Sequence, residues 1–155
     1  MRNNNFSFAF LFMLIQFSSS EILNGQILQF RTVCKLPSEL KESSGLISNN
    51  HGATFWSHND SDGKKIIYEI DSTCKLLRQV FIKNAISIDW EDITQDPSGN
   101  MYIGDFGNNN LNRKDLTIYK IPNPSLIVED TIIAESIYFT YLNQFDFPPT
   151  NDQKN

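Results

Sequence analysis

Four oxygen-bearing side chains lie where predicted strands begin or end: Glu42, Asn59, Glu91 and Asp105. Ca²⁺ takes about 6–8 oxygen ligands, and a bound ion of this kind polarises an ester or phosphate oxygen. One interpretation is therefore a calcium site in a hydrolase. The other is that these side chains accept hydrogen bonds from backbone N–H groups in tight turns. The capping interpretation is preferred, because four side chains are too few for a complete calcium site.

Other chemistry has weaker support in the sequence. The two histidines, His51 and His58, are accompanied by no GxSxG motif, so a nucleophilic triad is not indicated. The aromatic residues Trp56, Trp90 and Tyr102 fit packing between sheets, with a carbohydrate or peptide platform as the alternative. The paired cations at 64–65 and 113–114 indicate solvated surface charge.

The elements that must position these residues are short strands. Apolar and polar residues alternate over brief runs bounded by turn residues, and no sustained helical period follows residue 20. The strongest turn is DPSGN (96–100), because Pro presets φ and Gly accepts positive φ. An all-β protein is predicted, with strands at 26–36, 43–47, 53–58, 65–70, 76–83, 89–94, 101–106, 116–121 and 136–142.

The chain contains the same plan twice. Residues 42–46 align with 89–93 at a shift of 47, residues 56–59 with 102–105 at 46, and residues 67–70 with 118–121 at 51. Four strands repeated at about 45–50 residues are typical of β-propeller blades. We therefore expect two four-stranded antiparallel blades, the first unit at 42–84 and the second unit at 85–142. Residues 21–41 would be an N-terminal strand and linker, and 143–155 a polar inter-blade tail.

Two blades do not close a propeller. Each blade buries its faces on two neighbours in a ring of about 4–8 blades, and an isolated pair leaves its outer faces wet. Further blades or another chain are expected to complete the ring. The sequence is accordingly interpreted as a fragment, a truncated product or part of an assembly.

Several motifs together resemble a family of secreted, propeller-like proteins of unknown function, mostly bacterial. The motifs are ESSGL (42–46), WSHND (56–60), DWEDI (89–93), YIGDFGNN (102–109) and LTIYKIP (116–122). The similarity spans roughly residues 40–150, and the family looks distantly related to phytase-like and lactonase-like propellers. It implies that this chain is the N-terminal portion of a longer ring. Cys74 stands where a turn glycine is usual, and the absence of later blades puts a central-cavity activity in doubt.

The ends and composition of the chain indicate export. Residues 1–20 have a short basic start, an apolar run at 6–17 and small residues at 18–20, which is the layout of a signal peptide. The apolar run is shorter than the ~20 residues that span a bilayer, so no membrane association is expected after cleavage. The net charge of −5 argues against a nucleic-acid partner. A secreted, periplasmic or extracellular location is expected.

Two modification sites follow from that location. Cys34 and Cys74 could pair in an oxidising compartment, but nothing in the sequence brings them together, so the pairing stays open. Asn59-Asp60-Ser61 is a glycosylation sequon that applies only in a eukaryotic secretory pathway.

The sequence is compatible with two functions. The first is a secreted, non-catalytic binding or scaffold module with an unknown ligand. The second is the N-terminal part of a Ca²⁺-dependent esterase, lactonase or phytase-like hydrolase.

Overall fold

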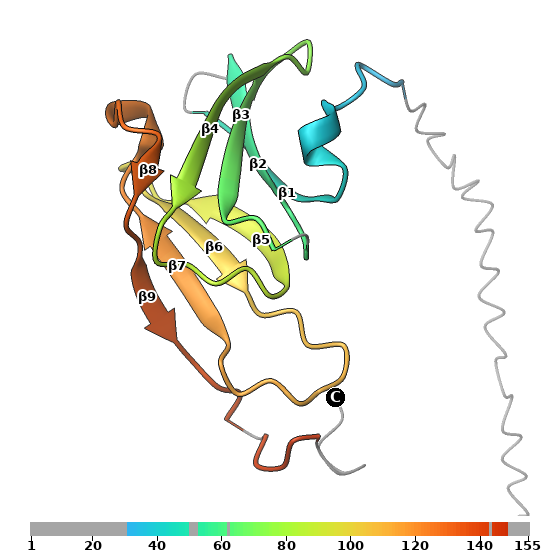
Figure 1. The fold of residues 1–155 in the computed structure, drawn as a ribbon, viewed down its shortest axis with the longest axis vertical. Coiled ribbons are helices and arrows are strands. Elements are labelled where there is room, and N and C mark those ends of the chain that lie inside the picture. Colours follow the sequence, from blue (N-terminus) through green and yellow to red (C-terminus); the bar gives the residue numbers. More distant parts are fainter. Residues whose placement is uncertain (1–30, 50–52, 62, 143, 149–155) are drawn as a thin grey trace, which may run out of the picture. The chain divides into compact units, whose positions relative to one another are not determined.

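The computed structural model describes residues 31–49, 53–61, 63–142 and 144–148. Within these ranges the chain forms strands and two short 3₁₀ helices, η1 (Ser38–Leu40) and η2 (Pro124–Leu126) (Figure 1). The predicted signal peptide at 1–20 and the first part of the predicted strand at 26–36 lie outside the described residues. Residues 31–36 are not a strand.

The described strands form two sheets (Figure 1). The first sheet has the order β1-β2-β3-β4-β8, and the second has the order β5-β6-β7-β9. The first sheet contains β1 (Ser43–Ser48), β2 (Thr54–Asn59), β3 (Ile66–Asp71), β4 (Leu76–Ile82) and β8 (Thr131–Ile132). The second contains β5 (Trp90–Gln95), β6 (Met101–Asp105), β7 (Thr117–Ile121) and β9 (Glu135–Tyr138). The prediction of an all-β chain with almost no helix is confirmed for the described residues.

The first sheet differs from the prediction by one strand. No strand was predicted between residues 121 and 136, in the connection after β7, but residues 131–132 pair in parallel with β4. Arg78 fixes this connection by donating to the carbonyl oxygens of Pro124 and Glu129 and to the carboxylate of Asp130. A two-residue strand is too short to show alternation, which is why the sequence pattern missed it. The last strand also ends at Tyr138, earlier than the predicted residue 142.

The duplication extends to the hydrogen-bond register. In the first sheet the pairing of β1 with β2 passes from Ser43↔Asn59 to Gly45↔His58, with a bulge between them. In the second sheet the pairing of β5 with β6 passes from Trp90↔Asp105 to Asp92↔Gly104, with a bulge at the same place. The same shift of 47 separates the two bulges on β1 and β5. The first strand of each unit, β1 or β5, is therefore bent in the same way. We name these two strands the inner strands.

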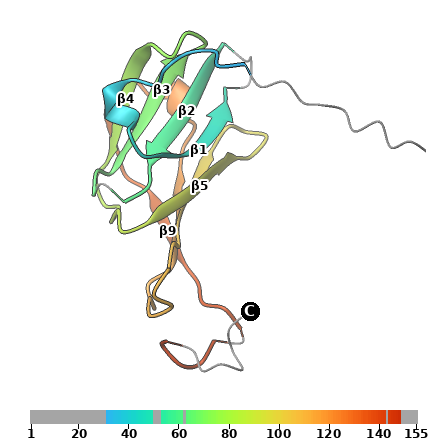
Figure 2. The same cartoon turned by 90° about the vertical axis from the view of Figure 1, so that its right-hand side faces the viewer.

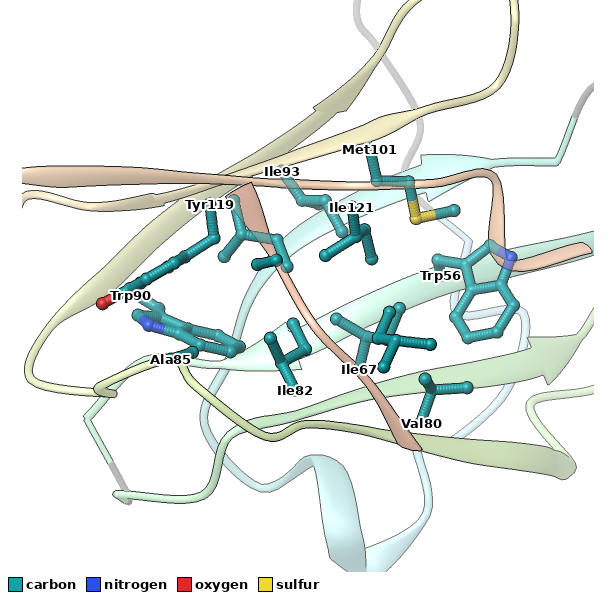
Figure 3. Close-up of a cluster of buried hydrophobic side chains, with 13 residues drawn as sticks. Trp56, Ile67, Val80, Ile82, Ala85, Trp90, Ile93, Met101, Tyr119 and Ile121 are labelled. Carbon is teal, nitrogen blue, oxygen red and sulfur yellow. The ribbon is translucent and has the colours of Figure 1, made fainter. Parts of the chain in front are cut away.

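The two sheets stack face to face through one hydrophobic core (Figure 3). We name the side of the first sheet that meets the second sheet its front face, and the side of the second sheet that meets the first its back face. The front face of the first sheet contributes Trp56, Ile67, Val80 and Ile82, all 0% exposed. The back face of the second sheet contributes Ile93, Met101, Ile103, Tyr119 and Ile121.

The inner strands β1 and β5 approach closely at Gly45. A Cβ at this position would lie 2.8 Å from Ile93 Cγ2 and 2.9 Å from His58 Nε2. The carbonyl oxygen of Asp60 accepts from the backbone N–H of Trp90 at 2.9 Å, which ties the two units together. A residue larger than glycine at position 45 would therefore push the two sheets apart.

The opposite side of the first sheet is covered by the segment at 31–41 (Figure 2). Leu40 of η1 is buried against Tyr68 and Ile70. A disulfide between Cys34 and Cys74 anchors the segment to the β3–β4 turn, with a Cα–Cα distance of 5.9 Å. Cys74 has a φ of 64°, the left-handed conformation that glycine adopts most readily.

Candidate functional site

Asn59 and Asp105 are equivalent buried caps at the ends of β2 and β6. Each is 1% exposed. Asn59 Oδ1 accepts from the backbone N–H of Glu42 at 3.2 Å, and Asp105 Oδ1 accepts from that of Asp89 at 3.1 Å. Glu42 and Asp89 precede the two inner strands by the same number of residues. The same side-chain position thus satisfies the same backbone donor in both units, as the capping interpretation requires.

Asp105 carries a charge that Asn59 lacks, and Arg113 neutralises it. Arg113 Nη1 donates to Asp105 Oδ1 at 2.8 Å and to the carbonyl oxygen of Gly107 at 3.0 Å. Burial alone would lower the pKa of Arg113, but hydrogen bonds and charges from Asp115 and Asp105 raise it overall. Arg113 is therefore a largely buried ion-pair partner, 11% exposed, and the prediction that it is a solvated surface charge is wrong.

Four carboxylates gather where β1 and β5 begin and β2 ends. We name Glu42, Asp60, Asp89 and Glu91 the acidic group. The ideal Cβ position of Gly107 falls on the carboxylates of Asp89 and Glu91, so these two side chains fill the space above that glycine. The group therefore lies at the contact between the two units.

Asp60 is the member of the acidic group whose pKa is shifted. Its partial burial raises the pKa of its carboxyl to about 6, and a hydrogen bond with Asp89 and the charges of Asp89, Glu91 and Glu42 act in the same direction. A raised carboxyl pKa means that the folded chain binds a proton between about pH 6 and the ordinary range of Asp. Asp60 is therefore the carboxyl group of the acidic group that takes up a proton in mildly acidic solution.

A cavity of about 350 Å³ borders the acidic group at Asp89. Its lining comes mainly from the loop after β6, including Asn109, Asn110, Asn112 and Arg113. Asn108 Oδ1 accepts from the backbone N–H groups of residues 112 and 113, which shapes this loop. The cavity is therefore lined by several amide side chains, with Asp89 of the acidic group at its border.

His58 is buried at the sheet interface and lies outside this cavity lining. It is 0% exposed, and its ring stands edge-on to Trp90 with a centroid distance of 5.6 Å. Burial lowers the pKa of His58, against backbone hydrogen bonds from Asn59 and Asp92 and the charge of Asp92. It is a core residue here, as are Trp56 and Trp90, and Tyr102 is half-buried on the other side of the second sheet.

The four predicted calcium ligands fall into two pairs with different surroundings. Asn59 and Asp105 point at backbone N–H groups within their own units, whereas Glu42 and Glu91 belong to the acidic group. Across the part of the chain that the structure describes, no three or more His, Cys, Asp or Glu side chains are arranged to hold a metal ion. Capping uses the Oδ1 atoms of Asn59 and Asp105, whichever role the other oxygens have.

The sequon at Asn59 is placed in the same buried cap. Its Nδ2, the atom that would carry a glycan, donates to the carbonyl oxygen of Glu39 at 2.7 Å. A glycan would need this atom at the surface, so the folded chain has no room for the modification.

Sequence reasoning missed Asp60 and Arg113. Asp60 carried a usable signal, since it follows the repeated cap position and faces Asp89 across the two units. Arg113 carried none, because a cation in an Asn-rich loop is normally solvated. The cysteine pair, left open by the sequence, is a disulfide in the structure.

Comparisons with protein-family models, with curated proteins and with solved structures gave no match. No helix among the described residues is long and apolar enough to cross a membrane.

Proposed function

We propose that this chain is a secreted, non-catalytic binding or scaffold module built from two blades of the β-propeller type. Two sheets of equivalent register, stacked face to face, support the blade assignment. The disulfide supports export, because such bonds persist in oxidising compartments. The capping roles of Asn59 and Asp105 support a structural use of residues that would otherwise suggest a metal site.

The observation that carries this proposal is the outer side of the second sheet, which we name its front face. Tyr102, Phe106 and Ile118 on this side are half-buried, and Ile137 is 38% exposed. The ring of Phe106 lies over Gly104, and Phe139 meets it edge-on at 6.2 Å. The same face carries Thr94 and the ion pair between Lys120 and Glu135, and apolar side chains bordered by polar ones are typical of an interaction surface.

The test compares Ile118→Asp with the control Leu77→Asp, which alters an exposed position on β4 of the first sheet. We expect the chain from its natural extracellular source to elute in a complex larger than a monomer. Ile118→Asp should release the monomer, and Leu77→Asp should retain the complex. A chain that is monomeric in that source, or that hydrolyses ester or phosphoester substrates, contradicts the proposal.

A second candidate is the N-terminal part of a calcium-dependent hydrolase of the esterase, lactonase or phytase-like type. The acidic group beside the 350 Å³ cavity favours it. If this candidate holds, millimolar Ca²⁺ raises the melting temperature and Glu91→Gln removes the rise. Identical melting curves in Ca²⁺ and in excess EDTA would rule out a calcium site of this kind in the chain.

A further inference from the structure

The two sheets use opposite faces for the contact between them. The duplication makes Trp56 equivalent to Tyr102, and Ile67 equivalent to Ile118. Trp56 and Ile67 lie on the first sheet's front face and are 0% exposed, because the second sheet covers them. Tyr102 and Ile118 lie on the second sheet's front face and are only half-buried. The same type of face is thus covered in the first unit and open in the second.

The opposite faces of the two sheets are also equivalent, and both of them are covered. Tyr119 and Ile121 on the second sheet's back face are equivalent to Tyr68 and Ile70 on the outer side of the first sheet. We name this outer side the first sheet's back face. Tyr68 is 1% exposed and Ile70 is 3% exposed, because Leu40 and the segment held by the disulfide cover them. The chain therefore stacks front to back, with a closed back end and an open front end.

Front-to-back contact is heterologous, because the two surfaces that touch are different: the front face of one sheet and the back face of the next. The open front face matches a back face of the type that carries Met101, Ile103, Tyr119 and Ile121. Both back faces of this chain are already covered, one by the first sheet and one by the 31–41 segment. A second copy of the folded chain therefore has no free back face to offer.

On this basis we propose that the front face of the second sheet binds the back face of a further sheet of the same four-stranded repeat, supplied by a different polypeptide segment. This inference rests on the proposed binding function and names its partner. Thr94, which is exposed, occupies the position of Ile47, which packs against the core. The docked sheet will therefore cover Thr94 together with Tyr102 and Ile118.

The test appends a second copy of residues 85–148 to the full chain, so that the probe is a third sheet of the same repeat. Thr94→Cys is introduced in the original copy only, and its thiol labelling rate is measured under non-reducing conditions. We expect labelling at least tenfold slower than in the single chain carrying the same substitution. Leu77→Cys, distant from the front face, is the matched control and should label equally fast in both proteins.

A variant of the probe separates docking from mere proximity. Tyr119→Lys in the appended copy alone damages its back face and should restore fast labelling of the cysteine at position 94. Labelling that is equally fast in the single chain and in the extended chain would overturn the proposal. That labelling result would not bear on the proposed non-catalytic function. Hydrolysis of a substrate would contradict the non-catalytic function, but it would not change the labelling rate.

Self-association gives an independent measurement if the appended sheet does not fold. The purified chain alone, separated from any partner, is expected to sediment as a monomer, because both of its back faces are covered. The double variant Cys34→Ser, Leu40→Asp frees the back face of the first sheet and should form head-to-tail oligomers, which Ile118→Asp prevents. A natural-chain dimer that Ile118→Asp dissociates would identify a second copy as the occupant and overturn the proposal. A double variant that remains folded and monomeric would do the same.

Discussion

Removal of the Arg113 side chain is expected to expose the difference between the two equivalent caps. In Arg113→Met the carboxylate of Asp105, 1% exposed, loses its only charged donor at 2.8 Å among the hydrogen bonds described. Two backbone N–H groups remain, those of Asp89 at 3.1 Å and Ile88 at 3.4 Å. Breaking one side of a buried ion pair costs about 3–5 kcal/mol, because the other charge stays buried without compensation.

The first unit provides the compensating variant. Asn59 performs the same cap without a charge, so an asparagine at position 105 should accept the same backbone N–H. Replacing both members of a buried ion pair is often close to neutral. The double variant Asp105→Asn, Arg113→Met should therefore lose only about 1–2 kcal/mol, mainly from the bond between Arg113 and the carbonyl oxygen of Gly107.

The measurement is a double-mutant cycle by urea unfolding of the wild type, both single variants and the double variant. We expect a coupling energy of about 2–3 kcal/mol between positions 105 and 113, with similar m-values throughout. The reasoning is refuted if Arg113→Met costs less than about 1 kcal/mol, the value typical of an exposed pair. It is also refuted if the two single effects simply add.

Three further outcomes are expected. Gly45→Ala should cost about 1–3 kcal/mol in thermal or urea unfolding, because the new methyl group overlaps the facing strand, whereas Ser48→Ala on the same strand should change little. Asp60→Asn should stabilise the chain above pH 6, and this gain should shrink as the pH falls towards 4. The reason is that a carboxyl group with a pKa raised to about 6 destabilises the folded state only when it is ionised. A gain in stability that does not depend on pH would contradict this reasoning. Reduction of the disulfide between Cys34 and Cys74, 40 residues apart, should cost about 4 kcal/mol on the chain-entropy estimate, and the double serine variant should match the reduced protein in stability.

The repeat was predictable because local rules determine it. Alternating residues and strong turns such as DPSGN place β5 and β6 within one or two residues of their predicted bounds. The shift of 47 found in the sequence is also the spacing of the two β-bulges. Register follows from alternation when one face of each strand is buried, and both units share that pattern.

Contacts between distant residues were not predictable in this way. The strand β8 and the bonds of Arg78 join segments about 50 residues apart, and neither leaves a periodic trace. The sequence also did not show that two of the predicted metal ligands accept backbone N–H groups. Asn59 and Asp105 match in the sequence because both cap a backbone N–H. Each unit needs an acceptor for the N–H before its first strand, and this need explains why the position recurs.

The front and back faces explain why the described part of the chain has one open side. A stack of equivalent sheets always ends in one front face and one back face, and each must meet another surface or remain in water. Here the back end is covered by Leu40 and fixed by a disulfide, both within a segment that has no counterpart in the second unit. Adding such a cover to the front end would make the stack self-sufficient. The front face instead keeps Tyr102 and Ile118 half-buried, at the positions where the first sheet buries Trp56 and Ile67 completely. The asymmetry follows from the direction of stacking, and it leaves the front face of the second sheet as the exposed end of the described stack.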